Sequence, residues 1–365
     1  MTPPRICGIC PPSAHHLAAA KATDQIYGVE PPATGKKLRE LLSIGQFIHS
    51  HALHFFMLAA PDFILGHDAP AEERNVIGLA RHSPDLAKKA IAARKFGQRL
   101  TEAVGGKPIH PSNALPGGMS TPLTEGKRAE LMTMANEALG IAREGWDLAR
   151  GLLDGVDTEF GGAVTTGFLG MANNGGVYST CDGPAMMLGP DGNHLGSFSG
   201  QDYTNFIEEY SEDWSYLKFA RFKGGNYYRV GPLARLNIVQ KMGTEHADAA
   251  LAEYREWFGT LTQATLAYNL ARYIEFLASC ERAVQLLSDP GITGSEIRTP
   301  VGAVVNRRGV GIIEAPPRGT LIHDYTVDEN GIIERCNLIV ATCQNNYGMD
   351  RGVEDMHAGW WRTER

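Results

Sequence analysis

Long runs of helical periodicity constrain the fold of this chain more than any other sequence feature. Apolar residues recur at helical spacing over residues 35–59, 125–153 and 247–287, and a shorter helix is expected over 14–25. Pro61 is expected to end the first long helix. Because helices this long occur without an internal repeat, they predict a bundle whose members pack along their lengths.

The segments outside these helices have a different pattern. Residues 154–200 are rich in glycine and turn pairs, which predicts short strands joined by hairpins. Residues 320–326 and 332–341 are expected to form two strands joined by a turn at 328–331. The sequence therefore predicts the α+β class, with a long-helix bundle as the core and small antiparallel β-sheets on its flank.

Composition and charge exclude several classes of protein. Of the 365 residues, 43% are hydrophobic and 21% are charged, which is the balance of a globular protein with a large core. The net charge of −7 is spread along the chain, so neither a nucleic-acid surface nor a basic membrane-binding patch is expected. No apolar run reaches the ~18 residues of a membrane span, and the N-terminus lacks the pattern of a signal peptide. We expect a soluble protein.

The sharpest chemical motif is the pair Cys7 and Cys10, separated by two residues and preceded by Arg5. Both sulfurs can reach one metal ion, and the nearby arginine favours the thiolate, which is the form that binds metals. Soft sulfur donors suit nickel, iron, zinc or an iron–sulfur cluster. From the motif alone, a structural zinc half-site or a redox dithiol is the simpler interpretation. The other cysteines are too sparse for a disulfide scaffold and are expected to be buried small hydrophobes: Cys181, Cys280, Cys336 and Cys343.

Segments along the chain resemble one known family. Arg-x-Cys-Gly-x-Cys followed by HHLAAAKATDQIYGVEPP is similar to the N-terminal metal-binding motif of nickel–iron hydrogenase large subunits. The chain looks most like the cytoplasmic multisubunit branch, which works with nicotinamide, deazaflavin or ferredoxin partners. Further segments that look like this family follow in family order, at 35–66, 105–118, 214–236 and 314–346.

The resemblance implies one hydrogenase large-subunit-like domain over residues 1–365. Its parts would be a metal-binding loop with helices, a glycine-rich β insertion, and a long helix with a β segment (1–153, 154–240 and 241–365).

The resemblance also implies a metal centre and a reaction. Cys7 would be terminal on nickel, and Cys10 would bridge nickel and an iron that carries cyanide and carbon monoxide ligands. The implied reaction is reversible heterolysis of H2, in which hydride is held between the metals while a thiolate or a neighbouring base takes the proton. The implied partner is an iron–sulfur small subunit, because electrons must leave a buried site.

Three candidate catalytic residues match family positions near the metals. Arg318 matches an arginine that overhangs the metals, where its permanent charge and rigid donors can hold anionic cyanide; the alternative is a surface turn arginine. Asp62 matches a carboxylate near that arginine, or is a turn residue at a helix end. His54, which shares a helix face with His51, matches a nearby hydrogen-bond donor. The loop 110–118 matches a family loop of architectural role.

The sequence also departs from the family pattern. The family's glutamate segment before Arg5 and its C-terminal Cys-x-x-Cys motif are missing, which leaves two of four sulfur ligands. An extra proline lengthens the motifs before His15 and Arg318, which can move either side chain out of line. We therefore expect a hydrogenase large-subunit fragment that is inactive alone. The alternatives are a non-catalytic scaffold that docks an iron–sulfur partner, as in respiratory complex I, and a zinc protein that uses both cysteines and His15 or His16.

Overall fold

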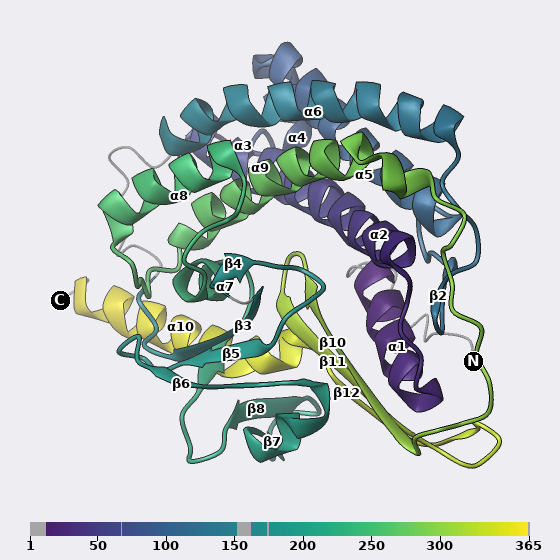
Figure 1. Cartoon of the computed structure of the whole chain (residues 1–365). Coiled ribbons are helices and arrows are strands. Elements are labelled where there is room, and N and C mark those ends of the chain that lie inside the picture. The colour runs from purple at the N-terminus through teal and green to yellow at the C-terminus, as the bar shows by residue number, and fades with distance from the viewer. Residues whose placement is uncertain (1–11, 67, 152–161, 174, 364–365) are drawn as a thin grey trace.

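Helices and sheets form two layers in this protein, whose structure is a computed structural model that describes residues 12–66, 68–151, 162–173 and 175–363. Figure 1 shows long helices stacked on one side and small sheets on the other. The predicted α+β class, with a long-helix core and antiparallel sheets on its flank, is confirmed. In the described part of the chain, no helix is both long and apolar enough to cross a membrane.

The helical layer has an apolar core. Its members and the helices that join it to the sheets are α1 (Pro12–Tyr27), α2 (Ala33–Ala52), α3 (Ala60–Leu65), α4 (Val76–His82), α5 (Pro84–Gly105), α6 (Glu125–Gly151), α7 (Pro232–Ile238), α8 (Glu245–Phe258), α9 (Ala267–Ser288) and α10 (Ala341–Thr363). Helix α2 packs between α5 and α9, and α6 packs on α9. The rings of Phe55, Phe56, Tyr273 and Phe276 meet edge to face where these helices cross.

Two helical predictions are wrong in their boundaries. Pro61 does not end the first run: α2 continues through a π-helical turn, Leu53–Ala59, into α3, where Pro61 lies in the first turn. Proline is tolerated there because its missing N–H would have no partner within the helix. The run over 247–287 is two helices, because Gly259, with a φ of 76°, ends α8 before α9 begins.

The strands form small sheets. Their bounds are β1 (Ala114–Leu115), β2 (Gly118–Met119), β3 (Gly167–Asn173), β4 (Val177–Tyr178), β5 (Ala185–Leu188), β6 (His194–Phe198), β7 (Ile207–Ser211), β8 (Lys218–Phe222), β9 (Tyr228–Arg229), β10 (Arg308–Ala315), β11 (Gly319–Val327) and β12 (Ile333–Ile339). One sheet has the order β4-β3-β5-β6 with β9 parallel to β3, another is the meander β10-β11-β12, and β7–β8 and β1–β2 form separate pairs. The hairpins predicted within 154–200 and 320–341 are confirmed.

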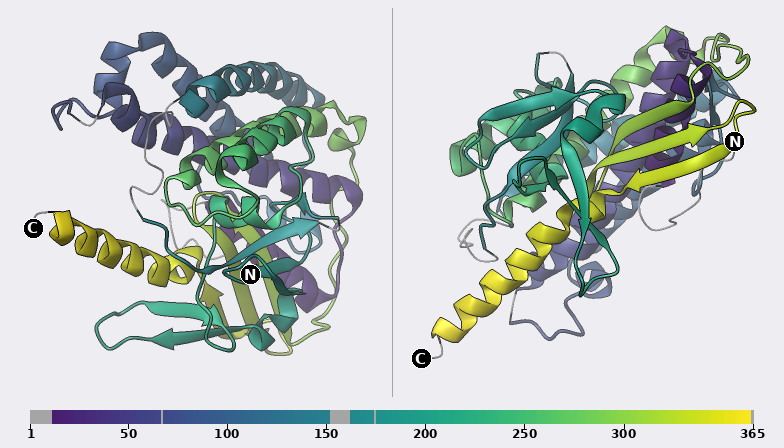
Figure 2. Two further views of the ribbon diagram at one scale, coloured as in Figure 1. Left: turned by 90° about the vertical axis from the view of Figure 1, so that its left-hand side faces the viewer. Right: turned by 90° about the horizontal axis from the view of Figure 1, so that it is seen from below.

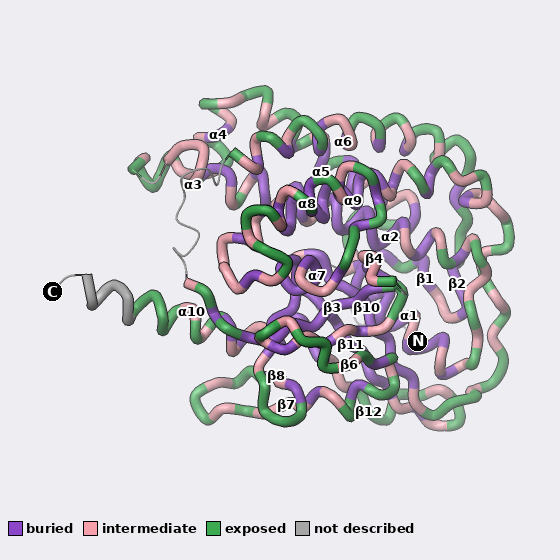
Figure 3. The backbone as a smooth tube through the Cα atoms, turned by 60° about the vertical axis from the view of Figure 1, so that its left-hand side comes forward, coloured by how far each residue is buried: buried purple, intermediate pink, exposed green. Residues whose placement is uncertain are grey.

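Helix α1 lies directly on β10 and β11, as two of the views show (Figures 1 and 2). The approach depends on Gly311, since a Cβ there would lie 1.9 Å from the carbonyl oxygen of Ala18. Figure 3 shows that β3, β10, α7 and most of α1 are buried, whereas α6 turns an exposed face to solvent. The first turn of α1 is therefore held against the sheet whose β10–β11 turn carries Arg318.

Candidate metal centre

The predicted metal ligands Cys7 and Cys10 lie outside the described residues. Among the residues that the structure does describe, no group of three or more His, Cys, Asp and Glu side chains could hold a metal ion. The ligand assignment therefore stays a prediction that rests on the motif in residues 1–11.

The turn between β10 and β11 is held by side chains at four successive carbonyl oxygens. Arg235 donates to the oxygens of Ala315 and Pro316 at 3.3 and 2.8 Å, and Arg272 donates to that of Pro317 at 3.3 Å. The side-chain amide of Asn345, in the first turn of α10, donates to the Arg318 oxygen at 3.1 Å. Since the two prolines have no N–H to form a normal turn, these side chains fix the backbone that carries Arg318.

Arg235 is the centre of a fully buried ion cluster beneath that turn. Its Nη2 lies 2.6 Å from a carboxylate oxygen of Glu275, and its Nη1 lies 2.8 Å from Glu314. Burial opposes its charge, but the two carboxylates outweigh burial and raise the pKa of Arg235. Glu275 also contacts His51 at 3.0 Å. Burial lowers the pKa of His51 to about 4, so its ring stays neutral at neutral pH.

Arg272 connects the turn to His54. Its Nη1 lies 3.0 Å from Nε2 of His54, and burial together with Arg272 lowers the pKa of His54 to about 3. Burial lowers the pKa of Arg272 to about 10, and the nearby charge of Arg318 contributes in the same direction. Two guanidiniums and a neutral imidazole therefore lie together at this place, where a cation-rich wall favours an anionic group.

Gly319 follows Arg318 because no larger residue fits. Its φ of 114° lies in the region that favours glycine, and a Cβ there would lie 2.3 Å from the backbone nitrogen of Gly231. The Arg-Gly pair thus sets the turn against the segment before α7, and the half-buried Arg318 side chain projects from a backbone that is fixed on both sides.

Asp62 lies in a different setting from the other candidate residues. It is exposed at the start of α3 and forms a 3.7 Å ion pair with Arg74. The described interactions include none between Asp62 and Arg318, so the role of this carboxylate stays a prediction. The loop 110–118 is anchored to the helices: Asp24 accepts from the Gly117 N–H at 2.7 Å, and Arg39 donates to the Leu115 carbonyl at 2.7 Å.

The first turn of α1 contributes two buried histidines. His15 Nδ1 lies 3.0 Å from Nε2 of His323 on β11, and His323 Nδ1 lies 2.6 Å from the Tyr325 hydroxyl. His16 Nε2 accepts from the backbone N–H of Ala114 at 2.9 Å. The contacts pin this turn to the sheet and to the loop 110–118.

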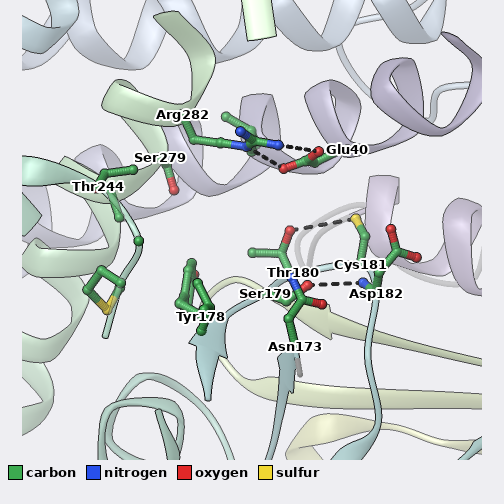
Figure 4. A pocket seen from close by; sticks show the side chains of 15 residues that line it. Glu40, Asn173, Tyr178, Ser179, Thr180, Cys181, Asp182, Thr244, Ser279 and Arg282 are labelled. Carbon is green, nitrogen blue, oxygen red and sulfur yellow. Dashed lines mark hydrogen bonds and ion pairs between the residues drawn. The ribbon is translucent and has the colours of Figure 1, made fainter. Parts of the chain in front are cut away.

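A cavity of about 420 Å³ lies away from these residues, between α2, α9 and the β3–β4 hairpin. Figure 4 shows the Glu40–Arg282 ion pair on one wall and Ser179, Thr180 and Cys181 on the other. Burial raises the pKa of the Cys181 thiol to about 11, so this sulfur is a poor metal ligand at neutral pH.

The prediction that the four remaining cysteines are buried is correct for two of them. Cys181 and Cys280 are buried, but Cys336 is exposed and Cys343 is half-buried. Cys336 lies on β12, the edge strand of its sheet, and most of that strand faces solvent.

The described residues fit an anionic metal centre. Nε of Arg272 is buried and has no hydrogen-bond partner among the described atoms, so a donor is available next to His54 and Arg318. Cyanide ligands and thiolates are acceptors that such donors can hold. The arrangement defines a class of site in which a fixed cationic wall faces an anionic, metal-bound group, with the metal ligands supplied from elsewhere in the chain.

Comparison with known proteins identifies the family. The family description "nickel-dependent hydrogenase" matches residues 1–83 and 191–354. A subunit of the vhu F420-non-reducing hydrogenase of Methanocaldococcus jannaschii is 45% identical, with 96% of this chain and 84% of that protein covered. The beta subunit of the NAD-reducing hydrogenase HoxS of Cupriavidus necator is 35% identical, with 96% and 76% covered. The chain therefore belongs to the nickel-dependent hydrogenases, as a large subunit of oxidoreductases that act on H2.

Solved structures agree with this assignment. The crystal structure of an NAD⁺-reducing [NiFe]-hydrogenase in the H2-reduced state superimposes with a TM-score of 0.91 at 40% identity, and covers 96% of this chain and 78% of that one. The [NiFeSe]-hydrogenase of Dm. baculatum shares the fold at 20% identity and a TM-score of 0.73. The family implies a nickel–iron centre.

The buried residues that hold the turn were missed by sequence reasoning. Arg235 lies within a segment that resembles the family, yet nothing local indicates that it contacts Glu314, 79 residues away. A signal did exist at Arg272 and Glu275, since both interrupt the apolar side of α9, where an unpaired charge would be costly. Such charges predict partners without identifying them.

Proposed function

We propose that this chain carries the hydrogen-cleaving centre of a nickel–iron hydrogenase, with Cys7 terminal on nickel and Cys10 bridging nickel and iron. The iron would carry cyanide and carbon monoxide ligands. The observation that carries this proposal is the set of hydrogen bonds to the four carbonyl oxygens of residues 315–318, which fixes the backbone of Arg318 beside Arg272 and His54.

The metal pair, when bound, supplies the place at which H2 is split into hydride and proton. The residues of the chain have distinct tasks around it. Arg318 holds anionic ligands by charge-assisted hydrogen bonds, and Arg272 adds positive charge in a setting of low dielectric. His54 remains neutral because of its lowered pKa, so it serves as a hydrogen-bonding group without adding a charge. Asp62 is proposed as a more distant carboxylate near the same wall.

The partners follow from the chemistry of the electrons. The two electrons from H2 need an acceptor, for which we propose an iron–sulfur small subunit, within a cytoplasmic multisubunit enzyme. The relatives are named as F420-non-reducing and NAD-reducing hydrogenases. We accordingly propose that the further partner is a nicotinamide-, deazaflavin- or ferredoxin-linked protein, and that the chain forms one large-subunit domain.

The test replaces Arg318 by lysine in the complete enzyme, assembled with its partner subunits. Lysine keeps the charge but loses the rigid fork, so H2-dependent reduction of a viologen dye is expected to fall by about 10²–10³-fold while nickel content is retained. Arg307→Lys is the matched control, since Arg307 forms an exposed ion pair with Glu334 next to the same sheet. Unchanged activity in Arg318→Lys would refute the assigned role.

A further inference from the structure

Three buried side chains form a continuous hydrogen-bonded chain that none of the roles above uses. His15 lies in the first turn of α1, and His323 and Tyr325 lie two residues apart on β11. The ring nitrogens of His15 and His323 are 3.0 Å apart, and the Tyr325 hydroxyl is 2.6 Å from the other nitrogen of His323. His15 is five residues after Cys10 in the sequence.

All three groups are neutral at neutral pH. Burial lowers the pKa of His323 to about 3, and burial lowers the pKa of His15 as well. Burial raises the pKa of Tyr325, so its hydroxyl keeps its proton. A neutral imidazole has one N–H and one accepting nitrogen, so the chain has a direction that is set by whichever end must donate.

The Tyr325 end determines this direction. Its hydroxyl has no other hydrogen bond among the described residues, and its surroundings are an apolar cluster: Ala19, Ala22, Ile26 and Val327. If the hydroxyl accepted from His323, its own proton would point into this cluster without a partner, at a cost of ~1–3 kcal/mol. The hydroxyl therefore donates to Nδ1 of His323. Nε2 of His323 then carries the proton and donates to Nδ1 of His15.

We propose that Tyr325 and His323 are positioning residues that fix His15 as a neutral imidazole with its proton on Nε2. The apolar end of the chain excludes a path for protons to solvent through Tyr325, so the chain orients a donor rather than conducting protons. What the donor serves rests on the proposed function: His15 Nε2–H is the hydrogen bond that the first turn of α1 offers to a thiolate or another anion of the metal centre.

The tautomers can be observed directly in the full chain labelled with ¹⁵N-histidine. Long-range ¹H–¹⁵N correlation spectra distinguish protonated from unprotonated ring nitrogens, and His323→Gln and His15→Gln assign the two rings. In the unaltered chain, both rings are expected to have protonated Nε2 and unprotonated Nδ1. A protonated Nδ1 on His15 would overturn the proposal, and this result needs no variant that might misfold.

A second measurement tests the role of the hydroxyl. Tyr325→Phe removes only the donor, so the nitrogen shifts of both rings are expected to move toward the average of two tautomers. Tyr273→Phe is the matched control, because that buried hydroxyl donates to the Ala142 carbonyl within the helical layer. Unchanged His15 and His323 spectra in a folded Tyr325→Phe chain would refute the proposal.

These outcomes are separate from the test of function. The spectra are recorded without metal, so the tautomer assignment can stand even if Arg318→Lys leaves hydrogenase activity intact. Conversely, a reversed tautomer leaves the role of Arg318 untouched. In the complete enzyme, Tyr325→Phe is expected to lower activity several-fold while nickel is retained, because the His15 proton is then divided between two nitrogens.

Discussion

At the scale of single residues, Arg235 is the side chain whose loss the core can least tolerate. Arg235→Leu leaves Glu275 and Glu314 buried without a cation, and an uncompensated buried charge costs ~3–5 kcal/mol. Urea unfolding is expected to show a loss of this size. Arg307→Leu, which removes an exposed ion pair, is expected to change stability by less than ~0.5 kcal/mol. Equal losses in the two variants would contradict the account of the cluster.

The cysteine pair gives a prediction about metal content. In the complete enzyme, Cys7→Ser and Cys10→Ser are each expected to abolish bound nickel, because a hydroxyl is a harder and far less acidic donor than a thiol. Elemental analysis of the purified enzyme measures this. Cys336→Ser is the control, since this exposed thiol on β12 lies in no proposed ligand set. Full nickel content in both motif variants would remove the basis of the assignment.

Single residues also mark the limit of sequence reasoning. Arg318 could be identified because its neighbours in sequence form a motif, and its backbone is indeed held as a functional group would require. Arg235 and Arg272 could not be assigned, because they act on the turn from 80 and 45 residues away. Spacing carries information about contacts within one helix or strand, and none about which distant carbonyl a buried guanidinium finds.

At the scale of elements, the β10–β11 turn depends on Gly319. Gly319→Ala is expected to cost more than the ~1 kcal/mol of an ordinary glycine-to-alanine change at positive φ, because its Cβ would also meet the backbone of Gly231 at 2.3 Å. Gly224→Ala separates the two effects. Gly224 has a φ of 99° with no atom within 4 Å of the added Cβ, so it measures backbone strain alone.

The same pair of variants tests the link between the turn and activity. Gly319→Ala displaces the segment next to Arg318, so its hydrogenase activity is expected to fall well below that of Gly224→Ala when both are measured in the complete enzyme. Urea unfolding gives the stability of each. If the two variants lose the same stability and the same activity, the close approach of Gly319 to Gly231 has no special role.

Helix and strand boundaries show where elements can be predicted. The hairpin over 320–341 was predictable because its turn residues and its strand pattern agree. The break at Gly259 was not, since α8 and α9 are both amphipathic and apolar residues recur on both sides of the break. Helix α10 was missed because its first residues follow a strand directly and its sequence is weakly apolar. Local pattern identifies an element better than it identifies its ends.

At the scale of the whole molecule, the fold brings the candidate site together from four parts of the chain. The first turn of α1, the end of α2, the middle of α9 and the β10–β11 turn meet around the buried charges. The α+β class and the family could be predicted from sequence, because both follow from motifs and periodicity. The packing could not, because α1 reaches the sheet through contacts 308 residues apart in sequence.

The buried histidines make a prediction about acid stability that belongs to the molecule as a whole. Burial lowers the pKa of His51 to about 4 and that of His323 to about 3, from the value of 6.5 that an exposed histidine has. Below pH 6.5 the unfolded chain therefore binds protons that the folded chain does not, and the folded state loses stability until the pH reaches the folded values. Above that pH, these groups leave stability unchanged.

Urea unfolding between about pH 7.5 and about pH 4.5 tests this, because each such histidine contributes a slope approaching ~1.4 kcal/mol per pH unit once it titrates in the unfolded chain. The free energy of unfolding is expected to fall steeply below about pH 6. Glu275 adds to the fall at lower pH: burial opposes its charge, but Arg235 and His51 outweigh burial and lower its pKa. His323→Gln should make the slope shallower by one proton. A flat or rising free energy of unfolding on acidification would mean that these rings take up protons inside the folded protein, and the neutral state that His54 and His15 require would then be wrong as well.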